Sequence, residues 1–197
     1  MNFLAHLYLS GNDTDLIIGN FIADAVKGRQ RELHSIEINH GINLHRFIDT
    51  YTDAHPIVEE SKKRLRPSYK KYSGVIVDVF YDHFLAAHWQ RFSEVSLHSY
   101  SEKIYELLSR NKTSFPEKSQ MILPYMIKYN WLVSYASLDG IEKVLTGMSR
   151  RTAFESNMNL ATSDLKIHYT LFENEFLAFF PLLIQEIEKY KLLNSHK

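Results

Sequence analysis

The sequence predicts an all-α protein that folds as a single helical bundle. Apolar residues recur at spacings of three and four along most of the chain, whereas the two-residue alternation typical of strands is rare. Only 7 Gly and 5 Pro occur in 197 residues, too few for the many tight turns of a β-rich fold. Hydrophobic residues make up 45% of the chain, which is enough for a packed core and argues against disorder. No internal repeat or long linker divides the sequence, so residues 1–197 are expected to form one domain.

Caps and breakers place the ends of nine predicted helices. Gly11 and Gly28 follow the first two helices, and Pro56 suits the first turn of the fourth, where a missing N–H group costs nothing. The last helix is expected to bend at Pro181. The predicted helices cover Phe3–Leu9, Asp15–Lys27, Ile36–Tyr51, Pro56–Arg66, Val75–Arg91, Ser99–Arg110, a segment that starts after Thr113, Asp139–Gly147 and Ser163–Leu193.

Composition excludes several classes of function. The 23 basic and 23 acidic residues cancel, so no broad basic field is available and no nucleic-acid partner is predicted. The absence of cysteine excludes disulfides, thiolate metal sites and a cysteine nucleophile. The longest apolar run, Phe176–Ile184, is too short to span a bilayer, and the amino terminus lacks the features of a signal peptide. We therefore expect a cytoplasmic protein without a membrane partner; its oligomeric state is left open.

Polar groups able to bind a metal lie on the apolar faces of four predicted helices. Residues four apart share a helix face, which pairs Asn20 with Asp24 and His45 with Asp49. A buried carboxylate without a partner costs several kcal/mol, and a shared divalent cation is one solution. Imidazole and carboxylate ligands suit Mn²⁺, Fe or Zn²⁺, and partly Mg²⁺. The candidate ligands are His6, Asp24, His45, Asp49, Asp82 and His83.

Each of these residues also has an ordinary structural interpretation. A single buried histidine is more often a hydrogen-bonded core residue than a ligand, and Asp49 with Arg46 would also make an ordinary ion pair on a helix surface. Repetition of the pattern on several helices favours the metal site. Two basic clusters, Lys62–Arg66 and Arg150–Arg151, are either solvated faces or sites that dock an acidic partner or hold a phosphate. No G-x-S-x-G, Walker A or G-x-G-x-x-G motif is present.

Five sequence blocks resemble the acyl carrier protein phosphodiesterase family. They are MNFLAH at 1–6, GNFIAD at 19–24, HRFIDTYTDAHP at 45–56, DVFYDHFLAAHW at 78–89 and GMSRR at 147–151. The blocks occur in the family's order and extend over nearly the whole chain. The resemblance implies an all-helical fold related to the HD-type metal phosphohydrolases, usually with Mn²⁺. It also implies removal of the 4′-phosphopantetheine arm from a serine of acyl carrier protein. Two positions depart from the pattern, since Tyr8 and Asn43 stand where the family often has histidine.

The resemblance and the helical spacing suggest one mechanism. One or two divalent ions would lower the pKa of a bound water, and the resulting hydroxide would attack phosphorus. Asp24 is expected to act at the reacting centre, Arg46 or Arg150 to stabilise the phosphoryl oxygens, and His6 to protonate the leaving serine. The ligands carried over are Asp24, His45, Asp49, Asp82 and His83, and the residues expected to steer the acidic carrier protein are Lys62, Lys63, Arg150 and Arg151.

Three other functions stay open from the sequence. The nearest is an HD-like phosphohydrolase that acts on a nucleotide or another small phosphoester. Another is a non-catalytic helical module that binds an acidic partner. The third is a purely structural bundle in which buried histidine and aspartate side chains satisfy one another. Metal content and the action on holo acyl carrier protein distinguish these possibilities.

Overall fold

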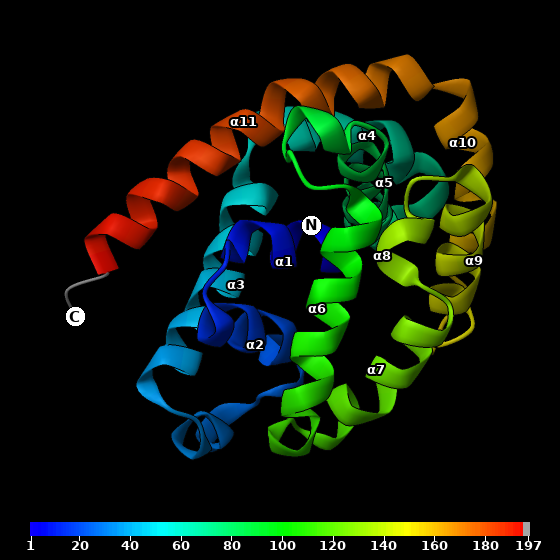
Figure 1. Ribbon diagram of the computed structural model, residues 1–197. Coiled ribbons are helices and arrows are strands. Elements are labelled where there is room, and N and C mark those ends of the chain that lie inside the picture. Colours follow the sequence, from blue (N-terminus) through cyan, green and yellow to red (C-terminus); the bar gives the residue numbers. More distant parts are fainter. Residues whose placement is uncertain (195–197) are drawn as a thin grey trace.

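The computed structural model describes residues 1–194, and all regular structure in that range is helical (Figure 1). The all-α prediction is therefore confirmed. Short 3₁₀ turns connect several of the helices. The α-helices are α1 (Phe3–Ser10), α2 (Thr14–Ile22), α3 (Ile36–Ala54), α4 (Pro56–Tyr69), α5 (Ser73–Ala87), α6 (Leu97–Asn111), α7 (Glu117–Lys128), α8 (Trp131–Ser134), α9 (Leu138–Ser149), α10 (Ala161–Ile167) and α11 (Tyr169–Asn194).

Helix α1 is short and lies in the interior, where it packs against α2, α3 and α5 (Figure 1). Leu4 and Leu7 on this helix are fully buried. Helix α11 runs along one edge of the molecule and contacts α3, α4 and α5. It contributes Phe172, Phe176 and Phe180 to the core, and burial of each such ring stabilises the fold by about 1.5–3 kcal/mol. The core thus holds α1 in place from several sides.

Helices α2 and α3 approach each other until their backbones touch. A Cβ atom on Gly19 would lie 2.7 Å from the Cα of Gly41, and one on Gly41 would lie 2.6 Å from the carbonyl oxygen of Leu16. Only glycine fits at either position, because real Cβ atoms do not approach other atoms so closely. The contact brings the polar residues that follow Gly19 and Gly41 on the two helices close together.

We expect Gly41→Ala to destabilise the protein by about 2–3 kcal/mol, because the added methyl group forces α2 and α3 apart. Gly74→Ala on α5 is the matched control. Its Cβ would lie at an ordinary 3.6 Å from the Cε of Lys62, and alanine favours a helix over glycine by about 1 kcal/mol. Urea unfolding of both variants measures the difference. Equal stability of the two variants would show that the helices can separate without cost.

Several helix ends differ from the prediction. Helix α2 ends at Ile22, and Asp24 lies in the 3₁₀ turn Ala23–Ala25 that follows it. Helix α4 continues through Pro67. The long final helix divides at His168 into α10 and α11, whereas α11 continues through Pro181. The helical spacing of apolar residues continues across the two prolines and across His168 alike. It therefore does not show that the helix breaks only at His168.

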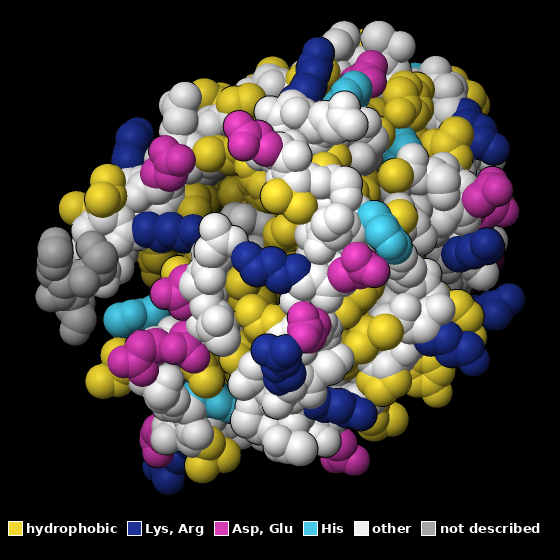
Figure 2. Space-filling view, in the orientation of Figure 1, with side chains coloured by type: hydrophobic (Ala, Val, Ile, Leu, Met, Phe, Trp, Pro, Cys, Tyr) yellow, Lys and Arg dark blue, Asp and Glu magenta, His cyan; other side chains and the backbone are white. Residues whose placement is uncertain are grey.

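Acidic and basic side chains are mixed on the face shown in Figure 2, without an extended field of one sign. This distribution agrees with the balanced composition of the chain. None of the helices in residues 1–194 combines the length and the apolar character that crossing a lipid bilayer requires.

Candidate metal centre

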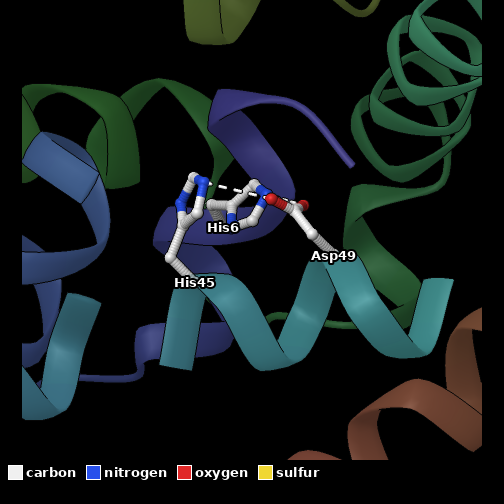
Figure 3. A group of neighbouring side chains, drawn as sticks. All are labelled: His6, His45 and Asp49. Atoms are coloured by element: carbon white, nitrogen blue, oxygen red, sulfur yellow. Dashed lines mark hydrogen bonds and ion pairs between the residues drawn. The ribbon is translucent and has the colours of Figure 1, made fainter. Parts of the chain in front are cut away.

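Two predicted ligands and His6, which was expected to protonate the leaving serine, converge where α1 crosses α3 (Figure 3). His6 comes from α1, while His45 and Asp49 lie one turn apart on α3. The Nε2 atom of His6 lies 3.1 Å from Oδ1 of Asp49, and Nε2 of His45 lies 3.2 Å from Oδ2. One ligand atom from each of the three residues fits within a 4.8 Å group. The two imidazole rings stack with their centroids 4.0 Å apart, so both present the same edge to the carboxylate.

Asn20 fixes both imidazole rings. Its Oδ1 atom accepts a hydrogen bond from Nδ1 of His6 at 2.9 Å and another from Nδ1 of His45 at 2.9 Å. Its Nδ2 group donates to the backbone oxygen of His6 and to Oγ of Ser10, which sets the orientation of the amide. Because each Nδ1 donates to Asn20, each Nε2 is the ring atom available to a metal, and His45 offers it once the proton on Nε2 is lost. Such outer hydrogen bonds are the usual means of orienting histidine ligands.

The charges at this centre favour a cation. Burial raises the pKa of Asp49, but hydrogen bonds from His45 and His6 outweigh burial and hold the pKa well below its usual range. Burial lowers the pKa of His45, but Asp24 and Asp49 overcome this effect and raise the pKa to about 9. Burial lowers the pKa of His6, against the opposing effect of the hydrogen bond to Asp49. A divalent cation would replace the ring protons that face this carboxylate, and its affinity would rise with pH as His45 loses its proton.

Asp24 completes the rim of the cluster. Its Oδ1 atom lies 3.4 Å from Nε2 of His45, and its side chain is largely exposed. A hydrogen bond from His45 lowers the pKa of Asp24 despite partial burial. The carboxylate is therefore ionised and stands within reach of an ion held by the three inner residues.

Asp82 lies elsewhere, and we remove it from the predicted ligand set. The carboxylate is fully buried and accepts hydrogen bonds from the backbone N–H groups of Asn2, Leu4 and Ala5 at 3.1, 2.7 and 3.3 Å. Burial raises its pKa to about 7, against the opposing effect of the chain's amino group and these N–H donors. Asp82 thus occupies the N-terminus of α1, where free N–H groups and the helix dipole favour a carboxylate. It supports the helix that carries His6.

His83 is also absent from the cluster. Its Nδ1 donates to the backbone oxygen of Tyr135 at 2.8 Å, and its Nε2 lies 3.0 Å from the hydroxyl of Tyr169. Both ring nitrogens therefore have protein partners, and this buried residue is a hydrogen-bonded core histidine. The general expectation for a single buried histidine holds here, although the adjacent Asp-His pair suggested a ligand.

The metal centre opens into a cavity of about 390 Å³. His6, Asp24, His45 and Asp49 all line it, together with two cations that are distant in the sequence, Lys118 and Arg151. The sequence did not predict a role for Lys118, because an isolated lysine on a predicted helix does not indicate a binding site.

Other predicted cations are placed differently. Arg46 is exposed and does not line this cavity. Lys62 is buried and donates to Oδ1 of Asp53 at 2.5 Å. It therefore stabilises the fold and is not available to bind an acidic partner protein. Lys63 is exposed and pairs with Glu60, and Arg150 is also exposed. Of the predicted phosphate-binding and partner-binding residues, only Arg151 lies at the metal centre.

The fold and the site define a helical protein with an inward-facing histidine–aspartate centre beside a cavity that also presents cations. Residues 1–183 match the family of acyl carrier protein phosphodiesterases, and the chain belongs to this family.

Relatives named acyl carrier protein phosphodiesterase match nearly end to end. The protein from Photorhabdus laumondii is 32% identical over 189 residues, which cover 95% of this chain and 96% of the relative. That from Pectobacterium atrosepticum is 33% identical, with 94% and 96% covered. An Escherichia coli relative is 31% identical over 98% of this chain and the whole of its own length. No solved structure matches the chain.

Proposed function

We propose that this protein hydrolyses the phosphodiester bond between 4′-phosphopantetheine and a serine of acyl carrier protein, with the help of a divalent cation. Membership of the family supports the substrate. The observation that carries the proposed chemistry is the convergence of two Nε2 atoms and one carboxylate at the wall of a cavity. Products would be the apo carrier protein and the free phosphopantetheine arm.

His6, His45 and Asp49 would hold the cation, with Asp24 available as a further oxygen ligand. The donor set of imidazole nitrogen and carboxylate oxygen suits Mn²⁺, Fe or Zn²⁺, and partly Mg²⁺. The resemblance to the family favours Mn²⁺ among these ions, with Fe or Mg²⁺ as alternatives. When bound, such a cation supplies positive charge to the phosphoryl oxygens and makes water more acidic. An ordered centre of this kind needs little rearrangement during the reaction, which is the usual source of electrostatic catalysis.

The cations of the cavity would bind the phosphoryl group. Arg151 donates through Nε to the backbone oxygen of Gly147 at 3.0 Å, which holds the guanidinium at the cavity and leaves its terminal N–H groups for phosphate oxygens. Lys118 adds a second positive charge. We assign His6 to the cation and not to the leaving group, because both of its ring nitrogens face protein groups, Asn20 and Asp49.

The substrate protein is acidic, so exposed cations such as Lys63 and Arg150 would speed its encounter with the enzyme more than they would tighten the complex. Salt should therefore lower the association rate. The proposal includes a cytoplasmic site of action, where the carrier protein is used.

The test is release of phosphopantetheine from purified holo acyl carrier protein. The enzyme is first stripped with a chelator and then supplied with Mn²⁺, Mg²⁺, Fe²⁺ or Zn²⁺ separately. We expect loss of mass from the carrier only in the presence of a metal, most rapidly with Mn²⁺. Carrier that binds but keeps its mass with every metal would support a binding module instead. Turnover of nucleotides without turnover of the carrier would indicate a different phosphohydrolase.

A further inference from the structure

A second cavity, of about 660 Å³, lies beside the metal centre. It is formed mainly by α8, α9 and the chain just before α8, from Tyr129 to Arg151. Phe3, Met148 and Arg151 line both this cavity and the one at the metal centre. The two spaces are thus neighbours that share a wall, with a cationic side chain at their junction.

We propose that this second cavity, here called the arm cavity, binds the pantetheine arm of the substrate during hydrolysis. The inference rests on the proposed function, because it needs a substrate whose phosphate lies at the metal centre. An arm attached to that phosphate must leave the centre in some direction. Phe3, Met148 and Arg151 line both spaces, so the arm cavity is the neighbouring space that an arm leaving the phosphate on this side would enter.

The size of the arm cavity fits this ligand. Sites for small organic ligands usually enclose about 300–1,000 Å³, and the volume of 660 Å³ falls within that range. The metal-centre cavity, at 390 Å³, is smaller, and the ligand side chains and the phosphate-binding cations line it. It therefore suits the phosphate, and the longer arm needs the additional space.

The lining of the arm cavity also matches the chemistry of the arm. Pantetheine alternates apolar parts, a gem-dimethyl group and methylenes, with two amide groups, and it ends in a thiol. Trp131 and Val144 offer apolar surface, while Lys143 and Ser134 add polar groups. The indole ring of Trp131 also contacts Phe3, with ring centroids 6.1 Å apart, so apolar surface continues from the shared wall into the arm cavity. A wall of mixed character recognises such a ligand better than a uniformly apolar or charged one would.

Gly147 provides a precise way to fill the arm cavity. It lines the space from helix α9, and a Cβ atom added there would meet no other atom within 4 Å. A larger side chain can thus enter without moving the backbone, and any residue other than proline suits a helix better than glycine. Gly147→Phe should block the arm while leaving the residues of the metal centre in place.

The experiment compares two substrates, holo acyl carrier protein and bis(p-nitrophenyl) phosphate, a diester without an arm. We expect Gly147→Phe to lower the ratio of their kcat/KM values, carrier over aryl diester, by about tenfold or more, since loss of a filled pocket costs at least that factor. Ile167→Phe, at an exposed position of α10 outside both cavities, is the matched control and should keep the wild-type ratio. An unchanged ratio in Gly147→Phe would overturn the assignment of the arm cavity.

Direct binding provides a second measurement. The chain has two tryptophans, and Trp89 is buried with its indole N–H bonded to the backbone oxygen of Val95. Pantetheine, which lacks the phosphate, should therefore change the emission of Trp131 in the wild-type protein and bind about tenfold more weakly to Gly147→Phe. Absence of any change in the wild type would count against the arm cavity. If the wild type never hydrolyses holo carrier protein, the proposed function fails, and this titration still decides whether the cavity binds the arm.

Discussion

Asp49→Ala is expected to abolish metal-dependent hydrolysis, with a loss of about a thousandfold or more in kcat. Among residues 1–194, Asp49 is the only carboxylate whose two oxygens face both imidazoles, at 3.1 Å from His6 and 3.2 Å from His45. Its removal leaves the two stacked rings with only the exposed carboxylate of Asp24 to attract a cation. The purified variant should also contain little manganese, which elemental analysis measures together with the rate of release of phosphopantetheine.

The variant should remain folded, because the Asp49 side chain is 43% exposed and no core packing depends on it. Asp15→Ala serves as the control, since Asp15 is, like Asp49, a half-buried aspartate, and it lies on α2 outside the cavity of the metal centre. Circular dichroism should give the same helical content for both proteins. Stoichiometric manganese and a wild-type rate in Asp49→Ala would show that the catalytic metal does not bind at His6, His45 and Asp49.

Asn20→Leu should weaken metal binding by about 10–100-fold, the usual effect of removing the partner that orients a ligand. Leucine has the same branched arrangement of heavy atoms but accepts no hydrogen bond from the two Nδ1–H groups. Both rings would lose their fixed orientation, and the protons would be free to move to Nε2, where they oppose a metal. We expect the metal concentration for half-maximal activity to rise, and the rate at saturating Mn²⁺ to recover in large part.

Recovery by excess metal separates positioning from simple damage to the fold. Ser10→Ala is the matched control, because Ser10 accepts a hydrogen bond from Nδ2 of Asn20 but does not contact either ring. It should change the metal requirement much less. If Asn20→Leu binds manganese as the wild type does, the rings are oriented by their packing alone.

The sequence predicted part of the site because the information was local. His45 and Asp49 are four residues apart, so any helix places them on one face, and the apolar neighbours of His6 indicated that it points inward. The choice of α1 as partner of α3 was not visible in the periodicity. The close contact of Gly19 with Gly41, which packs α2 against α3 and brings Asn20 to the two imidazoles, was not visible there either.

Asp82 and His83 show the limit of the same reasoning. Their positions on an apolar face correctly indicated burial, and a buried carboxylate does need compensation. Periodicity does not say what supplies it, and backbone N–H groups at the start of α1 satisfy Asp82 without an ion. The cavities were beyond sequence analysis for a related reason. Arg151 and Lys118 reach the metal centre only because helices far apart along the chain fold around α1.

The proposed metal ligands His6, His45 and Asp49 lie within the first 49 residues, whereas most of the proposed arm cavity comes from residues 129–151. On these assignments, hydrolysis and the choice of arm depend on separate stretches of the chain. Exchange of the later stretch between relatives would alter which arms are accepted while leaving the catalytic cation in its original setting. A library confined to that stretch would be a practical route to enzymes that remove synthetic labels from carrier proteins.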